Sequence, residues 1–168
     1  MSREGALLIT IALALALIAL GVWAWRRRVR RDNAISAPFG ETPSDVRTIA
    51  AFPVLYVATT KHGEPLERLA VKGLGFRSRA DVTVTDAGLA VDLTGQPRIF
   101  LPLDRITEVA QATVAIDRVV ERDGLVRITW RSGPDVAVDS YFRPQDASAR
   151  ALTDAVRGIL PTQTGTDA

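Results

Sequence analysis

The stretch ADVTVTDAGLAVDL, residues 80–93, decides the fold class of this chain. Apolar and polar side chains alternate with period two in its first half, and β-branched residues are frequent, which is typical of a strand with one buried face. Asp86, Ala87 and Gly88 interrupt the alternation, and a second apolar run follows directly. Two strand-like runs around so short a turn predict a β-hairpin.

Similar runs flank this hairpin on both sides, and glycine, proline and aspartate, the residues that favour turns, separate them. We expect further strands at residues 54–59, 98–101, 112–120, 125–130 and 136–142, with a short edge piece at 68–71. With the hairpin these make about seven strands. The sequence therefore predicts a mainly β, antiparallel domain.

The period of the apolar residues changes from two to 3.6 near the end of the chain. One face of a helix would carry Leu152, Ala155, Val156, Ile159 and Leu160. Asp146 is placed to cap or charge the first turn, and Pro161 ends the helix. The sequence thus predicts one amphipathic helix after the last strand.

The first 31 residues differ in kind from the rest of the 168-residue chain. Residues 6–25 carry no charge, and Thr10 is their only polar side chain. A helix of this length spans about 30 Å, the thickness of the hydrocarbon core of a bilayer. The residues that follow the apolar run, or end it, favour the membrane interface. They are Trp23, Trp25, Arg26, Arg27, Arg28, Arg30 and Arg31.

The order of charges around this segment predicts its orientation. A secretory signal peptide would carry its positive cluster before the apolar run, whereas here the arginines come after it. Only Arg3 precedes the run, and Glu4 offsets it. The positive-inside rule therefore places the N-terminus outside and the C-terminal part in the cytoplasm, in a single-pass protein of the cell membrane.

The net charge of +2 does not describe the part of the chain that follows the span. The first 31 residues hold six of the 21 basic and one of the 19 acidic side chains, so residues 32–168 carry 15 and 18, a net charge of −3. Nucleic acid binding needs clustered lysine and arginine against phosphate. The acidic domain therefore argues against a nucleic acid partner.

Strands followed by a single amphipathic helix form the order found in pleckstrin-homology-like barrels, and three further phrases resemble bacterial members of that family and the related GRAM type. They are VTVTDAGL at 82–89, IFLPLDRI at 99–106 and LVRITW at 125–130. The resemblance covers about residues 50–160. It implies a seven-stranded antiparallel barrel capped by the C-terminal helix, with Leu152, Val156 and Ile159 over one open mouth.

With its span and arginine cluster, the chain is also similar to a group of actinobacterial membrane-anchored proteins, some of which are named as transporters or export proteins. The expected organisation is a transmembrane helix at 6–25, then a basic juxtamembrane segment and linker at 26–50. A cytoplasmic domain follows at 51–160, and a disordered tail at 161–168. A single span cannot form a transport pathway by itself, so we interpret the chain as an accessory at most.

Most catalytic chemistry lacks the residues it needs. There is no cysteine, and the single histidine, His62, cannot build a multi-histidine metal site and is expected in a solvated turn. Gly73 and Gly75 lack the third glycine of a dinucleotide motif and predict a bend. The aromatic residues of the domain are expected in its core. They are Phe76, Phe100, Trp130, Tyr141 and Phe142.

The best candidate ligand site is a small group of basic residues, Lys72, Arg77 and Arg79. Domains of the resembling fold that bind phosphoinositides place basic residues in a comparable first loop, and this spacing could converge on a phosphate. The alternative is that Arg77 and Arg79 share one solvated face of a strand.

From these observations we expect a membrane-tethered, non-catalytic binding or scaffolding module at the cytoplasmic face, with a protein partner and no cofactor or metal. One alternative is an anionic-lipid sensor, and another is an accessory subunit of an export or transport complex. The membrane lipid around the N-terminal helix is a further expected partner, and self-association of the chain stays open.

Overall fold

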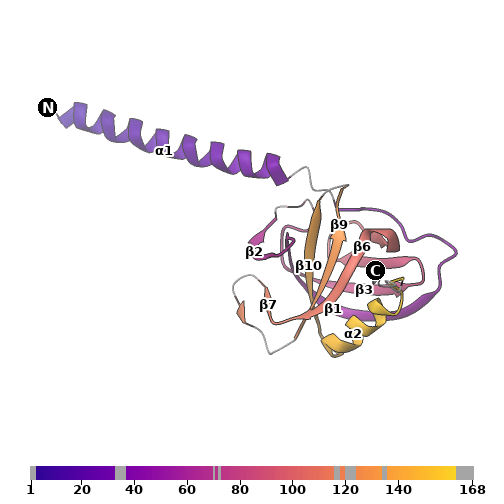
Figure 1. Ribbon diagram of the computed structural model, residues 1–168. Coiled ribbons are helices and arrows are strands. Elements are labelled where there is room, and N and C mark those ends of the chain that lie inside the picture. The colour runs from indigo at the N-terminus through magenta and orange to yellow at the C-terminus, as the bar shows by residue number, and fades with distance from the viewer. Residues whose placement is uncertain are drawn as a thin grey trace, which may run out of the picture. The chain divides into compact units, whose positions relative to one another are not determined.

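The computed structural model describes residues 3–32, 37–69, 71, 73–115, 118–119, 124–133 and 136–161. The chain divides into two compact units, Met1–Ala34 and Ile35–Ala168. The first unit holds one helix, and the second holds the sheet and the second helix (Figure 1).

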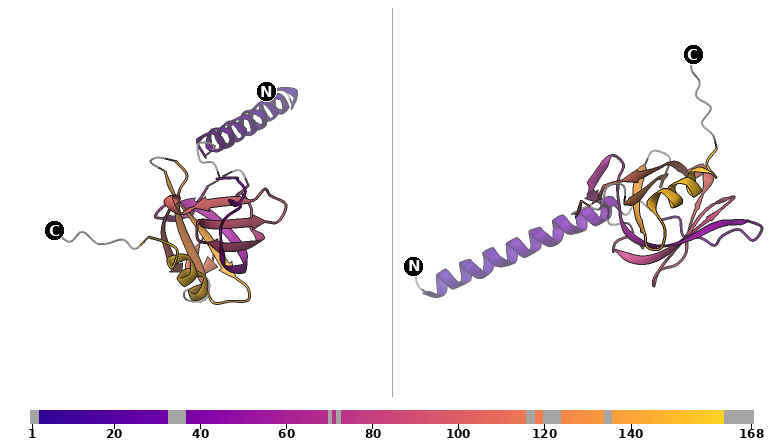
Figure 2. Two further views of the ribbon diagram at one scale, coloured as in Figure 1. Left: turned by 90° about the vertical axis from the view of Figure 1, so that its right-hand side faces the viewer. Right: turned by 90° about the horizontal axis from the view of Figure 1, so that it is seen from below.

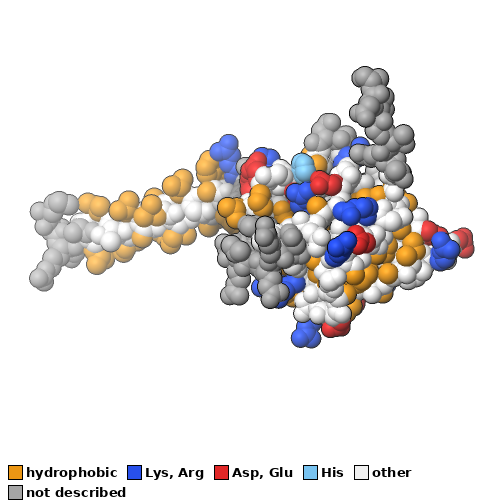
Figure 3. All heavy atoms as spheres, turned by 60° about the horizontal axis from the view of Figure 1, so that its bottom comes forward, with side chains coloured by type: hydrophobic (Ala, Val, Ile, Leu, Met, Phe, Trp, Pro, Cys, Tyr) orange, Lys and Arg blue, Asp and Glu red, His pale blue; other side chains and the backbone are white. Residues whose placement is uncertain are grey.

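Helix α1 (Arg3–Asp32) is continuous and contains the apolar run. Its segment Leu7–Arg27 is long and apolar enough to cross a membrane, and its side chains are exposed. Hydrophobic side chains cover its surface along this segment (Figure 3). Nothing within the unit buries that surface, as expected for a helix that is surrounded by lipid.

The second unit is built on one antiparallel sheet. Its strands are β1 (Thr48–Lys61), β2 (Glu64–Arg68), β3 (Ser78–Thr85), β4 (Gly88–Leu93), β5 (Ile99–Pro102), β6 (Ile106–Ala112), β9 (Leu125–Arg131) and β10 (Ala137–Pro144). Their order is β5-β4-β3-β1-β10-β9-β6, and β2 pairs with β1. The predicted hairpin is confirmed as β3 and β4, joined by a two-residue turn. Strands β7 (Val114–Ala115) and β8 (Arg118–Val119) form a separate small sheet.

Strand β1 joins the two halves of the sheet. It pairs with β3 from Thr48 to Tyr56 and with β10 from Val54 to Lys61, with a bulge between Tyr56 and Ala58. The strands of the β3–β5 half run across those of the β6–β10 half (Figure 1, Figure 2). A long bulged strand that serves both halves lets one sheet fold over on itself around a core.

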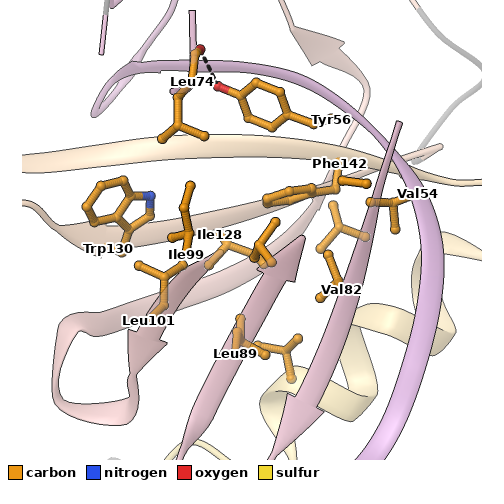
Figure 4. Packing of buried hydrophobic residues seen from close by; sticks show 14 of the residues in the cluster. Val54, Tyr56, Leu74, Val82, Leu89, Ile99, Leu101, Ile128, Trp130 and Phe142 are labelled. Carbon is orange, nitrogen blue, oxygen red and sulfur yellow. Dashed lines mark hydrogen bonds between the residues drawn. The ribbon is translucent and has the colours of Figure 1, made fainter. Parts of the chain in front are cut away.

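Helix α2 (Ala149–Arg157) packs mainly against β6 and β9. Leu152 and Val156 are fully buried, as predicted, and Ile159 packs against the same core. The core includes Trp130, Phe142 and aliphatic side chains from nearly every strand (Figure 4). One apolar cluster thus holds both halves of the sheet and the helix together.

Two predicted features of the sheet are wrong. The single strand expected at 112–120 is not formed, because its described residues hold the end of β6 and the two-residue strands β7 and β8. The strand that pairs with β9 in the sheet is instead β6, which begins at Ile106 directly after a 3-10 turn (Leu103–Arg105). Its exposed Thr107, Glu108 and Gln111 weaken the apolar alternation that would have marked it. The edge piece expected at 68–71 lies earlier, as β2.

The first strand and the helix also differ from expectation in their boundaries. Strand β1 runs through Pro53. Pairing with β10 begins only at Val54, so Pro53 lies where one side of β1 is an edge, which is where strands tolerate proline. The cap of α2 is Ser148, whose hydroxyl accepts a hydrogen bond from the Ala151 amide, and not Asp146.

Candidate functional site

The segment between β2 and β3, which we call the β2–β3 loop (residues 69–77), carries the predicted ligand site. Leu69, Val71 and Leu74 are buried and anchor it, whereas the Phe76 side chain is 86% exposed. The expectation that Phe76 belongs to the core is therefore wrong. The neighbouring apolar residues already fill the interior, and Phe76 lies in a bend that presents it to solvent.

A chain of buried hydrogen bonds fixes the position of this loop. Trp130 Nε1 donates to Ser140 Oγ at 2.9 Å, and the Ser140 and Thr59 hydroxyls lie 2.8 Å apart. The Thr59 and Tyr56 hydroxyls are also 2.8 Å apart, and Tyr56 donates to the Leu74 carbonyl at 2.8 Å (Figure 4). Because the indole can only donate and the carbonyl can only accept, every hydroxyl donates in the same direction, from Trp130 to Leu74.

The buried position of Tyr56 in this series of hydrogen bonds also changes the pKa of its hydroxyl group. Burial raises the pKa of Tyr56 far above its ordinary value of about 10. Tyr56 therefore stays neutral and keeps donating to Leu74 across the physiological pH range. The β2–β3 loop is held by the core, with Phe76 and the following arginine at its outer side.

The predicted basic residues are only partly brought together. Arg77 ends the loop and Arg79 lies in β3, and both side chains are exposed. Neither forms an ion pair within the part of the chain that the structure describes. Lys72 lies outside the described residues. Phe76 and the two arginines thus form an exposed apolar and basic group, which we call the Phe76–Arg79 patch (residues 76, 77 and 79).

The two end strands of the sheet present different edges. Strand β6 pairs with β9 on one side, and no described strand pairs with its other side. Thr107, Glu108 and Gln111 on β6 are exposed, and Val109 and Ile106 point into the core. An unpaired strand edge offers a row of backbone donors and acceptors to an extended chain.

The outer edge of β5 is already occupied. Phe39 forms a bridge with Ile99, the Gly40 amide donates to the Arg98 carbonyl at 3.2 Å, and the Phe100 amide donates to the Pro38 carbonyl at 3.0 Å. A short piece of the stretch that composition suggests is linker therefore lies along β5 and pairs with it through one isolated bridge. Of the two strands at the ends of the strand order, β6 is the one whose outer side has no strand partner among the described residues, while the short β2 pairs only with β1.

His62 lies in the turn after β1, as predicted, but it is not simply solvated. Its Nδ1 is 3.0 Å from Oδ1 of Asp139, a carboxylate on β10 that is fully buried. The Thr129 hydroxyl and the Gly63 amide donate to the same carboxylate at 2.7 and 3.2 Å. The buried charge is thus surrounded by donors, and this arrangement fixes the β1–β2 turn to β10.

On α1, the predicted interface residues lie at the end of the apolar segment. Trp23 and Trp25 are exposed, and the Arg27 guanidinium lies 5.5 Å from the centre of the Trp23 ring. Arg26 is exposed beside them. The side chains of the remaining arginines, Arg28, Arg30 and Arg31, lie outside the described residues. Indoles paired with arginines are typical of a helix end at the membrane–water boundary.

A bent antiparallel sheet closed by one C-terminal helix, with an exposed loop patch and one open strand edge, defines a pleckstrin-homology-like domain. Such domains are typically non-catalytic and bind lipids or proteins. The chain belongs to the family described as Bacterial PH domain-like, which matches residues 36–157.

A solved structure has the same fold. It is the solution structure of the C-terminal phosphotyrosine interaction domain of mouse APBB2, with a TM-score of 0.50 and 13% sequence identity. The alignment covers 75% of this chain and 96% of that domain. At this identity the similarity shows the fold alone. No curated protein matches the sequence.

Proposed function

We propose that this protein is a membrane-tethered, non-catalytic binding module that holds a protein partner at the cytoplasmic face of the cell membrane. Helix α1 supplies the tether, and the pleckstrin-homology-like domain supplies the binding surface. Tethering raises the local concentration of a partner at the membrane, which strengthens a weak contact without any new interaction.

The observation that carries this proposal is the side of β6 that has no strand partner among the described residues. An extended segment of a partner can add to such an edge through backbone hydrogen bonds, while neighbouring side chains give specificity. Helix α2 packs beside this strand, and Arg150 and Arg157 are exposed on it. Both arginines form ion pairs with Asp154, at 3.6 and 3.4 Å, so α2 presents side chains of both charges beside β6.

The proposal is tested with two matched variants of the full chain, Gln111→Lys on β6 and Gln145→Lys just after β10. Both glutamines are exposed and both substitutions add one positive charge. A lysine on an edge strand disfavours strand addition. After crosslinking in cells and extraction in mild detergent, we expect the complex with a soluble protein to be lost only in Gln111→Lys. Equal recovery in both variants would rule out the β6 edge.

The same experiment distinguishes the binding of a soluble protein at β6 from an accessory role in an export or transport complex. Recovery of polytopic membrane proteins alone, unchanged in Gln111→Lys, would favour that role over strand addition on β6. Recovery that follows α1 and not the domain would point the same way.

The orientation is tested by single cysteines, because the chain has none of its own. We expect a membrane-impermeable maleimide added to intact cells to label Ser2→Cys and to leave Thr162→Cys unlabelled until the membrane is opened. The reverse pattern would contradict a cytoplasmic domain.

The Phe76–Arg79 patch supports a second candidate function, binding to an anionic membrane surface. An exposed aromatic ring next to two arginines without ion-pair partners in the described chain combines apolar insertion with charge attraction. Lys72 belongs to this candidate by sequence. The net negative charge of the domain opposes it, which is why it stands second.

Vesicle flotation of residues 35–168 tests this second candidate. We expect binding to phosphatidylglycerol vesicles, but not to phosphatidylcholine vesicles, and a loss of binding in the triple variant Lys72→Glu, Arg77→Glu and Arg79→Glu and in rising salt. Arg143→Glu, an exposed arginine on β10, is the control. Equal flotation of the triple variant and the control would exclude the patch.

A further inference from the structure

Residues 37–42, which we call the strap, lie on the outer edge of β5 although they precede the first strand by several residues. Ala37 is buried, at 3% exposure, and Phe39 lies directly opposite Ile99. The strap thus pairs with the sheet in the way that an added peptide would, but it belongs to the same chain.

The pairing between the strap and β5 is short. Two backbone hydrogen bonds join it to β5, and the Phe39 side chain remains 40% exposed. Arg98 lies 3.5 Å from the Thr42 hydroxyl and 4.0 Å from the Glu41 carboxylate, but its main partner is Asp92 at 2.7 and 2.8 Å. By comparison, β1 is paired with β3 over eight register positions. Elements with few buried contacts open at a lower free energy than the fold as a whole.

The Phe39 ring rests on a glycine of the β2–β3 loop. A Cβ on Gly73 would lie 2.6 Å from Cζ and 2.9 Å from Cε1 of Phe39, so a side chain at this position would force the ring to shift. Gly73 also has a φ of 82°, in the left-handed region. The strap therefore touches both β5 and the loop that carries the Phe76–Arg79 patch.

The position of the strap in the chain gives it a mechanical role. Helix α1 ends at Asp32, so four residues join it to the strap. If the strap leaves β5, the connection lengthens to 14 residues, 33–46, because two hydrogen bonds still join Arg47 to Asp86. At about 3.4 Å per residue, the maximum span of the connection rises from roughly 14 Å to roughly 50 Å.

We infer that the strap is a releasable internal ligand of the β5 edge, and that its release lengthens the tether between α1 and the domain. With the strap bound, the domain stays within a short reach of the end of α1, and the β2–β3 loop carries the Phe39 ring. With the strap released, the domain gains reach and the β5 edge becomes available for pairing. The release of the strap goes beyond the proposed function. Only its effect on the distance between the domain and the membrane depends on the proposed membrane anchor.

Hydrogen exchange of the full chain tests the release directly, because the Phe100 amide donates to the strap at Pro38. In Phe39→Ala we expect this amide to exchange about tenfold faster, since most of the ring's buried area is lost. The Gln145 amide, which donates to Pro53 elsewhere in the domain, should be unchanged. Unchanged exchange at Phe100, or acceleration of both amides together, would show that the strap is an integral part of the fold and would overturn the inference.

A matched pair of glycine variants gives a second test without touching the strap. Gly63 and Gly73 both have positive φ, 75° and 82°, but a Cβ on Gly63 would meet nothing within 4 Å. Both alanine variants place a side chain on a backbone in the left-handed region, and only Gly73→Ala displaces the Phe39 ring. We expect faster exchange at Phe100 in Gly73→Ala alone, and equal rates in the two variants would contradict the contact.

The change in reach is tested by locking the strap. Phe39 and Ile99 form a pair with hydrogen bonds on either side, in which Cα atoms lie about 4.5 Å apart, a separation that a disulfide can bridge. In the variant Phe39→Cys with Ile99→Cys, energy transfer is measured from a fluorescent residue at Gln145 to labelled lipid in phosphatidylethanolamine–phosphatidylglycerol vesicles.

We expect higher transfer efficiency in the oxidised, locked form than after reduction. Equal efficiency in the two forms would overturn the link between the strap and reach. No transfer in either form, with the exchange results as expected, would contradict the membrane anchoring of the proposed function and leave the strap established.

Discussion

The two strands at the ends of the sheet, β5 and β6, differ in whether their outer edges are paired. The edge of β5 is paired by the chain's own residues 38–40, whereas the edge of β6 has no strand partner among the described residues. An unpaired edge is a liability that proteins normally cover or blunt. This difference between the two edges is the reason why we propose β6 as the strand that binds the protein partner.

The supports behind the two edges also differ. Strand β6 is backed by α2, whose Leu152 and Val156 are fully buried. On the covered side, Ile99 and Leu101 belong to the same core, and polar contacts add to it, namely the Tyr56 bond to Leu74 under the loop and the Arg98 contacts to the strap. The open edge is thus part of a rigid platform, and the covered edge is closed by a lightly held segment.

The largest effect is expected on the open side, from Leu152→Ala. Removing a fully buried leucine side chain from between α2 and the sheet costs about 2–5 kcal/mol of unfolding free energy. Leu160→Ala, which truncates a leucine at the partly exposed end of the same segment, should cost much less. Urea unfolding of the full chain in detergent measures both, and equal losses would contradict the role of α2 as the support of β6.

Tyr56→Phe should produce the next largest effect, on the covered side. It removes the donor to the Leu74 carbonyl and the acceptor of the Thr59 hydroxyl, both buried, at a cost of about 1–3 kcal/mol. The same urea experiment measures it. A loss below the experimental error would mean that the buried chain of hydroxyls does not hold the β2–β3 loop.

Alkaline pH offers a way to sharpen this prediction. Burial raises the pKa of both tyrosines of the chain, Tyr56 and Tyr141, with a further increase at Tyr141 from the charge of Asp139. Because the folded pKa values exceed the unfolded value of about 10, stability is fully present below pH 10. Above pH 10 it falls by up to about 1.4 kcal/mol per pH unit for each tyrosine, until the pH reaches the folded pKa of that tyrosine. Tyr56→Phe should reduce this slope, and a tyrosinate absorbance rise near pH 10 in the folded wild type would contradict it.

The smallest effect is expected from Arg98→Gln. The side chain is 38% exposed, and partly exposed ion pairs contribute less than about 1 kcal/mol. Its loss should therefore leave urea unfolding nearly unchanged but speed exchange at the Phe100 amide, since Arg98 also contacts the strap. Arg150→Gln, on the exposed face of α2, should change neither quantity.

Much of the fold could be predicted because it depends on local patterns. The β3–β4 hairpin, the burial of Trp130 and the C-terminal helix follow from alternation, residue type and period. The missed strand, β6, lies at the end of the sheet and carries exposed polar residues at Thr107, Glu108 and Gln111. These polar residues interrupt the apolar alternation by which a strand is recognised in a sequence.

The candidate surfaces were harder to foresee, because they depend on contacts between distant residues. Nothing near Phe39 or Gly73 in the sequence shows that the two touch, and a proline-containing stretch of small residues resembles a linker. The exposure of Phe76 likewise depends on which neighbours fill the interior. The buried hydrogen-bonding role of Asp139 could not be predicted from the sequence either, because its three donors come from the β1–β2 turn and β9.

The difference between the two edges is tested most directly by a photoreactive benzoylphenylalanine in place of Gln111 on β6, and in a second variant in place of Phe100 on β5, in the full chain in native membranes. The account predicts adducts with another protein from position 111, and only intramolecular products from position 100. Intermolecular adducts from position 100 with none from position 111 would contradict it.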